Sequence, residues 1–495
     1  MNIKIDIQNL LEEIGSGNMS STAYDTAWVA RLGEIDWDLS SNALNWLCEH
    51  QLPDGSWGAE KPFYYHDRVI STLSAMIALT YRGRRARDRA QIENGLLALE
   101  RITSGATQGL QADPNGATIG FEMITPSLVE EAEKLGIIKK QGERILGRLS
   151  ELRKLKLQKM MGHKINRHVT MAFSAEMAGL DSQDMLDVNN LQEENGSVGH
   201  SPSATAYFVR DVCPGDIRGL EYLHKVIARD GSLPNLFPFE VYERAWILWN
   251  LSLINSLDTT IKDLFKPYLD FLQASWHPKK GIGLSVGFTV PDGDNTSVVF
   301  DLLTQYHREI DINGLLAFEE QEYFRCYDLE ANPSFSVNIH ALAGLKRIGY
   351  DTNHPRIKKI LSFLHQGQTS LGYWFDKWHI SPYYTTAHAI ITCTGYSNKL
   401  IEPAVQWIIA TQQKNGSWGF YLQTAEETAY CLQALSIYQQ RGGKLPPGIL
   451  KRGADWLRLN QNPPYPLFWI GKGLYAGELV IRSAIISALA LVNGI

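Results

Sequence analysis

The sequence QQKNGSW, residues 412–418, has the spacing Gln-x-x-x-Gly-x-Trp. The same spacing recurs at residues 51–57 and 368–374, and residues 192–198 carry a weaker form that ends in valine. Asp-Gly and Asn-Gly dipeptides inside such segments indicate turns. Each copy therefore joins the end of one helix to the start of the next. There the glutamine can bond free backbone groups, and the tryptophan can cover the junction.

A second pattern, close to polar–Thr–Ala–aromatic, lies between these turns. From Thr205 onward its copies are about 40–50 residues apart, and the segments around them have the apolar period of helices. Paired helices at this period can stack as a solenoid or close into an α/α barrel, so we predict an all-α fold. The copies occupy residues 25–28, 204–207, 244–246, 295–298, 338–340, 385–388 and 427–430.

The regularity of the copies suggests two domains, which the length of 495 residues also favours. The copies are regular from about residue 200 onward and less regular before it, where a charged helix is expected at residues 143–164. We interpret residues 36–195 as a second helical domain inserted into the first. Residues 1–35 and 196–495 would then form the first domain.

Bulk composition excludes several classes of function. The net charge of -6 gives no reason to expect a nucleic-acid partner, and no apolar run is long enough to span a bilayer. The acidic N-terminal segment does not resemble a signal or transit peptide. The five cysteines have no CxxC spacing, which favours buried thiols in a reducing compartment. We therefore expect a cytoplasmic protein.

The acidic stretch Asp292-Gly293-Asp294-Asn295-Thr296 precedes an apolar helical segment. One interpretation is a helix N-cap, for which Asp and Asn are common. The other is chemical, because two carboxylates this close can keep one of them protonated. Protonating an alkene requires such an un-ionised acid in a water-poor site, and only Asp292 or Asp294 can supply the proton here.

Together these segments resemble a class II terpenoid cyclase, most closely the bacterial two-domain diterpene cyclases of the tuberculosinyl (halimadienyl) diphosphate synthase kind. The resemblance covers almost the whole chain. It implies a β domain and an inserted γ domain, both α/α barrels, with the active site between them. The segments that carry it are the Gln-x-x-x-Gly-x-Trp turns and residues 21–28 (SAYDTAW-like), 44–60, 120–122, 126–128 and 292–296 (DxDDT-like).

The resemblance implies that Asp294 is the proton donor and that Asp292 orients it. Asn295 replaces the last aspartate of the family pattern, and its amide can still donate a hydrogen bond to the acid. The sequence contains no DDxxD cluster, so ionisation of the diphosphate is not expected and the diphosphate should be retained. A separate downstream enzyme would then remove it.

Carbocations are stabilised by aromatic faces, although packing is the alternative role for any single aromatic residue. The candidates are Tyr207, Trp246, Trp374, Trp378 and Tyr384.

By resemblance, the diphosphate is expected near Lys164, Lys377 and Lys472, each of which could instead be a solvated surface charge. Asp113 and Glu122 are the candidate Mg²⁺ ligands, because Mg²⁺ takes carboxylates together with phosphate oxygens.

The expected product depends on the terminal base. Pro234-Asn235 resembles plant ent-copalyl diphosphate synthases, in which this Asn pairs with a His, and the matching position here falls on Phe173. Without that base, the first bicyclic cation can undergo hydride and methyl shifts before it loses a proton. We therefore expect geranylgeranyl diphosphate to give kolavenyl (clerodienyl) diphosphate, with halimadienyl (tuberculosinyl) or copalyl diphosphate as alternatives.

Three other classes remain open from the residues. A triterpene cyclase of the squalene-hopene type uses the same acid, but the diphosphate-associated segments would be unexplained. A protein-prenyltransferase β subunit needs a zinc site with Asp, Cys and His, and no cysteine here has that context. A non-catalytic helical scaffold gives no reason for two acids at a buried helix start.

Overall fold

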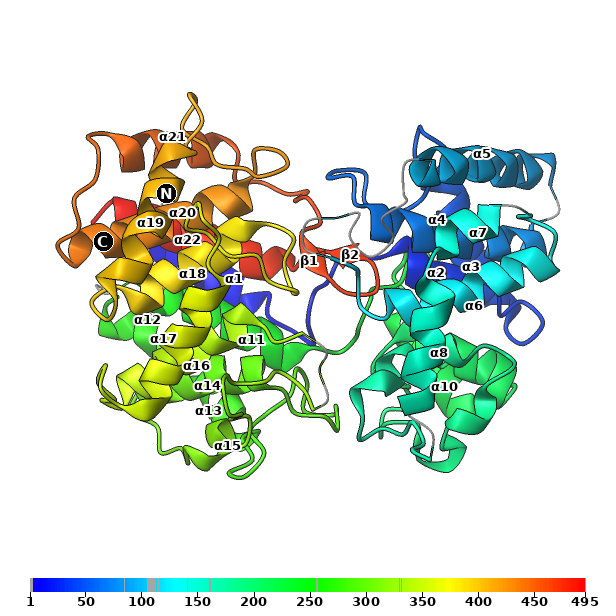
Figure 1. Cartoon of the computed structure of the whole chain (residues 1–495), viewed down its shortest axis with the longest axis horizontal. Helices are drawn as coiled ribbons and strands as arrows, with labels where there is room; N and C mark the ends of the chain where they lie inside the picture. The colour runs from blue at the N-terminus through cyan, green and yellow to red at the C-terminus, as the bar shows by residue number, and fades with distance from the viewer. Residues whose placement is uncertain are drawn as a thin grey trace.

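The computed structural model describes residues 3–83, 85–104, 113, 116–139, 141–159, 162–254, 257–328, 330 and 332–494. Two helical bodies lie side by side, and a short hairpin lies between them (Figure 1). Within the described residues, the hairpin is the one sheet, formed by the antiparallel strands β1 (Trp469–Ile470) and β2 (Leu474–Tyr475). The all-α fold class expected from the sequence is confirmed.

The larger body is a closed ring of helices with a second layer outside it. Each ring helix packs against the next, and the last packs against the first. In ring order the helices are α11 (Glu240–Ser252), α14 (Gly293–Gln305), α16 (Phe335–Arg347), α18 (Pro382–Cys393), α20 (Ala425–Gln440) and α22 (Glu478–Val492). The outer helices are α1 (Ile3–Glu12), α12 (Thr259–Leu264), α13 (Lys266–Ala274), α15 (Asn313–Leu316), α17 (Pro355–Gly367), α19 (Asn398–Ala410) and α21 (Ile449–Leu459).

Burial separates the two layers of this barrel. All residues of the ring helix α18 are buried, whereas the outer helix α17 buries only Ile357, Ile360 and Leu364, one stripe of an amphipathic helix. A ring helix is therefore buried on both faces, because it packs inward on the barrel core and outward on the second layer.

The smaller body is also a ring with outer helices. Its ring is α2 (Ala23–Ala30), α4 (Tyr65–Arg82), α6 (Phe121–Lys134), the 3₁₀ segment η2 (Thr170–Ala178) and α9 (Pro202–Tyr207), which packs back on α2. The remaining elements are α3 (Trp37–Glu49), α5 (Ala86–Thr103), α7 (Gln141–Leu146), α8 (Leu149–Lys159), α10 (Ile217–Val226) and the short turns η3 (Gln183–Met185), η4 (Val188–Asn190) and η5 (Phe208–Val212).

The two hydrophobic cores divide the chain differently from the sequence prediction of 1–35, 36–195 and 196–495. Residues from Ala23 to Leu233 contribute to the core of the smaller body, whereas α1 and residues from Val241 onward contribute to the core of the larger one. Helix α2 belongs to the smaller ring because it closes that ring between α4 and α9. The repeat copies at residues 25–28 and 204–207 are thus part of the second barrel, so the repeat alone could not separate the domains.

The Gln-x-x-x-Gly-x-Trp turns have the structure that the sequence predicts. Gln412 Nε2 donates to the carbonyls of Gly416 (3.0 Å) and Ile449 (2.9 Å), and Trp418 Nε1 donates to the carbonyl of Ile408 (2.7 Å). The copies at residues 51–57 and 368–374 make the same set of bonds. Each turn therefore joins the last turn of one helix to the first turns of the next outer helix.

Candidate active site

The acidic stretch begins helix α14, so its N-cap interpretation is correct in part. Asp292 is the N-cap residue, and its carboxylate accepts hydrogen bonds from the backbone N (2.7 Å) and the side-chain Nδ2 (2.9 Å) of Asn295. Burial raises the pKa of Asp292 to about 7, with a further increase from the charge of Asp294, while the bonds from Asn295 oppose the shift. A carboxyl group with this pKa is only partly ionised near neutral pH, so it places less than a full negative charge beside Asp294.

Asp294 is held by a pair of buried histidines. His340 Nδ1 lies 2.6 Å from Asp294 Oδ1, and His340 Nε2 lies 2.8 Å from His388 Nδ1. Burial, together with the neighbouring His340 and His379, lowers the pKa of His388 well below its usual value, so this ring is neutral. Ser336 Oγ lies 3.5 Å from the other oxygen of Asp294. Both oxygens of the Asp294 carboxyl therefore have a neighbour that orients them. His388 adds no positive charge to this buried cluster.

Asp376 fixes the start of helix α16 beside the acid. Its Oδ1 accepts from the backbone N of Phe335 (2.7 Å) and of Ser336 (3.2 Å) and from the hydroxyl of Ser334 (2.9 Å). Ser336 Oγ also lies 3.1 Å from Asp376 Oδ2. Asp376 therefore positions Ser336 and His340, which lie on the same helix, relative to Asp294.

The sequence prediction of the site did not include His340, His388, Ser336 or Asp376. The two histidines occupy the aromatic position of the second repeat, which the pattern identified without a role. At that position, the ring of His340 lies 5.7 Å from the ring of Trp246 and 5.1 Å from that of His388. The ring of His388 lies 5.8 Å from that of Tyr430. The aromatic positions of the repeat are therefore ring-helix positions whose side chains lie close together at one end of the barrel.

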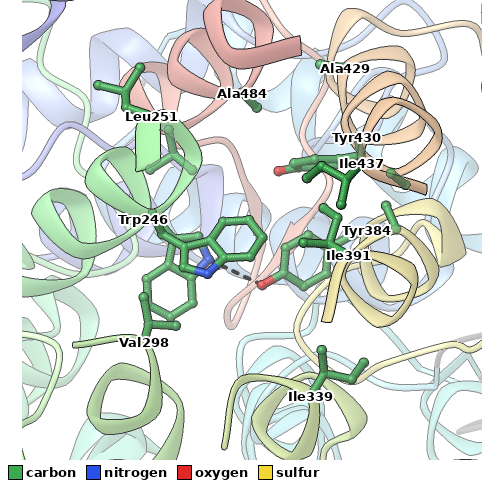
Figure 2. Packing of buried hydrophobic residues seen from close by; sticks show 14 of the residues in the cluster. Trp246, Leu251, Val298, Ile339, Tyr384, Ile391, Ala429, Tyr430, Ile437 and Ala484 are labelled. Carbon is green, nitrogen blue, oxygen red and sulfur yellow. Dashed lines mark hydrogen bonds between the residues drawn. The ribbon is translucent and has the colours of Figure 1, made fainter. Parts of the chain in front are cut away.

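Aromatic side chains surround this end of the barrel. Trp246 and Tyr384 point toward one another from α11 and α18, with the indole Nε1 3.3 Å from the tyrosine hydroxyl (Figure 2). Tyr242 stacks on Trp246 at 4.4 Å, and Trp469 of the hairpin lies 4.9 Å from Tyr384, between ring centres. These faces provide the electron-rich wall that a carbocation requires.

Not all predicted aromatics lie in this wall. Trp374 is fully buried in its turn, where Nε1 bonds the carbonyl of Leu364, so its place in the fold is structural. Tyr207 belongs to the core of the smaller barrel and donates its hydroxyl hydrogen to Gly179. Trp378 lies nearer to the aromatic wall than these two residues do, because its backbone carbonyl accepts a hydrogen bond from the backbone N of Ile470 in the hairpin. The wall predictions for Trp374 and Tyr207 are corrected accordingly.

The three predicted diphosphate lysines have different environments. Lys472, at the hairpin tip, is fully buried, and its Nζ lies 2.6 Å from Glu176, 2.7 Å from the hydroxyl of Ser201 and 2.6 Å from that of Ser203. In this structure it therefore links the two barrels, and its role in diphosphate binding stays a prediction. Lys377 pairs with Glu330 at 2.5 Å and is a quarter exposed, and Lys164 is exposed.

Phe173 and Asn235 meet around the same lysine. The Lys472 ammonium lies 4.5 Å from the ring centre of Phe173, and the Lys472 backbone N donates to Asn235 Oδ1 (3.2 Å). Asn235 Nδ2 in turn donates to Asp25 (2.9 Å). Phe173 and Asn235 therefore contact the same lysine, and their role as the base position stays a prediction.

The predicted magnesium ligands do not form a cation site in this structure. Asp113 caps helix α4: its oxygens accept from the backbone N of Tyr65 and His66 (both 3.1 Å), and Oδ2 lies 2.6 Å from His66 Nδ1. Glu122 is paired with Lys156. Among the residues that the structure describes, no group of three or more His, Cys, Asp or Glu side chains could hold a metal ion. Both carboxylates bond protein groups in this structure, their role as magnesium ligands stays a prediction, and no reaction step is assigned to the ion.

The comparisons with known proteins agree with this geometry. The squalene-hopene cyclase C-terminal domain model matches residues 325–464. A type B diterpene cyclase of Mycobacterium tuberculosis is 49% identical over 98% of both chains. The (+)-kolavenyl diphosphate synthase of Herpetosiphon aurantiacus is 29% identical over 99% of this chain and 97% of its own. The solved structure of ent-copalyl diphosphate synthase from Streptomyces platensis has a TM-score of 0.82 at 28% identity, with all of both chains covered.

Within the described part of the chain, no helix is long and apolar enough to cross a membrane. The 49% identity extends over nearly the whole chain and includes both barrels and the acidic helix start. This protein belongs to the class II diterpene cyclases.

Proposed function

We propose that the protein cyclises geranylgeranyl diphosphate by protonating its terminal alkene and retains the diphosphate. The observation that supports this most directly is Asp294, a buried carboxyl held at a helix start by His340 and bordered by the Trp246–Tyr384 pair. An acid in a water-poor aromatic site is the arrangement that alkene protonation requires. The Herpetosiphon relative and the Streptomyces structure are both named as diphosphate synthases.

In this proposal the residues of the chain have separate tasks. Asp294 transfers its proton, and His340 holds the carboxyl in place during the transfer. The faces of Trp246 and Tyr384 stabilise the cation as positive charge moves through the forming rings. No residue ionises the diphosphate.

The proposed product is a rearranged labdane-type diphosphate, kolavenyl (clerodienyl) diphosphate. The support is Phe173, the position that the resemblance matches to the His of a His–Asn base, because a phenyl ring cannot accept a proton from the first bicyclic cation. Phe173 and Asn235 both contact Lys472. The cation then rearranges before it is quenched. Halimadienyl (tuberculosinyl) and copalyl diphosphate are the alternative products, and product identification separates the three.

The test is incubation of the purified protein with geranylgeranyl diphosphate, followed by phosphatase treatment and mass-spectrometric and NMR identification of the alcohol. Asp294→Asn should lower turnover by about 10²-fold or more, since the amide cannot supply the proton. Asp38→Asn, at an exposed aspartate of the smaller barrel, is the matched control. Turnover by Asp294→Asn near the wild-type rate would show that another group is the acid.

Three further experiments address the remaining parts of the prediction. Farnesyl diphosphate and squalene as substrates test chain length and the triterpene-cyclase alternative. A chelator titration tests the requirement for Mg²⁺, which remains a prediction, as does the downstream enzyme that removes the diphosphate.

A further inference from the structure

Glu426, in the first turn of helix α20, is a buried carboxylate that the reaction described so far does not use. Its side chain is 1% exposed. Oε1 lies 2.9 Å from Trp469 Nε1, 3.0 Å from the Tyr430 hydroxyl and 3.2 Å from His379 Nε2. Oε2 is buried and has no hydrogen-bond partner among the described residues. A buried carboxylate oxygen without a hydrogen-bond partner is unfavourable, so its retention needs a reason.

The ring order places Glu426 across the barrel from the acid. Helix α20 is separated from α14 by α16 and α18 on one side and by α22 and α11 on the other, and both carboxyl groups are in the first turns of their helices. The aromatic wall lies between them: the ring of Tyr384 is 5.5 Å from that of Tyr430, and its hydroxyl bonds Trp246. A substrate bordered by these aromatics would have Asp294 at one side and Glu426 at the other.

We propose that Glu426 is the general base that ends the reaction, which rests on the proposed cyclisation. Asp294 gives a proton to the terminal alkene, and the ring bonds form. Glu426 Oε2 then removes a proton from the carbon next to the final cation. The electrons of that C–H bond become the new double bond, so the product is an isomer of the substrate. Solvent restores the proton to Asp294 and takes it from Glu426 before the next turnover.

The base is assigned to Glu426 and not to the neighbouring Glu427, because the oxygens of Glu427 already have hydrogen-bond partners. Both oxygens of Glu427 are occupied: Oε1 by Ser381 (2.5 Å) and the backbone N of Phe420 (2.9 Å), and Oε2 by the hydroxyl of Thr424 (2.8 Å). Burial raises the pKa of Glu427 to about 7. Glu427 therefore holds the start of α20 together, and Glu427→Gln is a matched control at the same depth.

The experiment compares Glu426→Gln with Glu427→Gln and the wild type on geranylgeranyl diphosphate, with folding checked by circular dichroism. Glutamine keeps the acceptor for Trp469 and Tyr430 but cannot take the proton. We expect Glu426→Gln to consume substrate while the fraction of the wild-type product falls about tenfold or more, replaced by other alkene isomers or water-quenched alcohols. Glu427→Gln should keep the wild-type product.

An unchanged product distribution in folded Glu426→Gln would overturn the assignment. Loss of substrate consumption would also overturn it, because the base acts after the protonation that Asp294 controls. If Glu426→Gln does not fold, Glu426→Met, which also cannot take the proton, replaces it, with the same change of product expected and the same two outcomes decisive. Failure of the wild type to turn over the substrate would instead refute the proposed function.

Discussion

The hairpin tip provides the sharpest test of how the two barrels are held together. Lys472 is carried by the larger barrel's chain, and its ammonium lies within 2.6 Å of Glu176 in the smaller barrel. Lys472→Met keeps the length and apolar stem of the side chain and removes the charge. Glu176 then loses its cation, and its Oε2 already has no hydrogen-bond partner among the described residues. The hydroxyls of Ser201 and Ser203 each lose one hydrogen bond.

Breaking a buried ion pair from one side costs about 3–5 kcal/mol, because the remaining charge stays buried and uncompensated. The prediction is a loss of this size in the free energy of unfolding. It is measured by urea denaturation with circular dichroism and tryptophan fluorescence. The two barrels can unfold separately, so the transition of the smaller barrel is fitted on its own.

Lys451→Met is the control, since Lys451 pairs with Asp455 on an exposed helix face and such pairs contribute about 0–1 kcal/mol. Adding Glu176→Gln to Lys472→Met should recover part of the loss, because the double variant no longer buries an unpaired charge. If Lys472→Met unfolds at the same urea concentration as Lys451→Met, the ammonium is hydrated and the interdomain tie does not exist.

Two further predictions concern the site. The pKa of Asp292 is raised in the folded protein to about 7, so the fold binds this proton more tightly than the unfolded chain, and stability should fall as pH rises from about 4 to about 7. Asp292 contributes at most about 4 kcal/mol to this decrease. Urea unfolding across that range should therefore show a smaller decrease in Asp292→Asn, where the contribution of Glu427, whose pKa is also raised to about 7, remains. Phe173→His should move part of the product toward copalyl diphosphate, as seen by product analysis, because it places a base at the position that the resemblance matches to the His of a His–Asn base. An unchanged spectrum would show that Phe173 is not at the base position.

The local features of the fold followed from the sequence. The Gln-x-x-x-Gly-x-Trp spacing predicted turns in which Gln412 bonds free carbonyls, because a glutamine amide and a glycine at that spacing satisfy helix ends in any surrounding. Asp292 was identified as the start of a helix for the same local reason. Domain boundaries did not follow, since helix α2 carries the same repeat as the larger barrel and is assigned only by its packing on α4 and α9.

The sequence by itself therefore determined the helical repeat, the acidic helix start and the family resemblance, all of which depend on residues close together in the chain. Only the tertiary structure decided which groups act on one another. His340 meets Asp294 across 46 residues, and Lys472 meets Glu176 across 296. Such contacts depend on ring closure and on the docking of the hairpin, which no local spacing encodes. For the same reason, the sequence did not predict that Lys472 is buried and paired with Glu176.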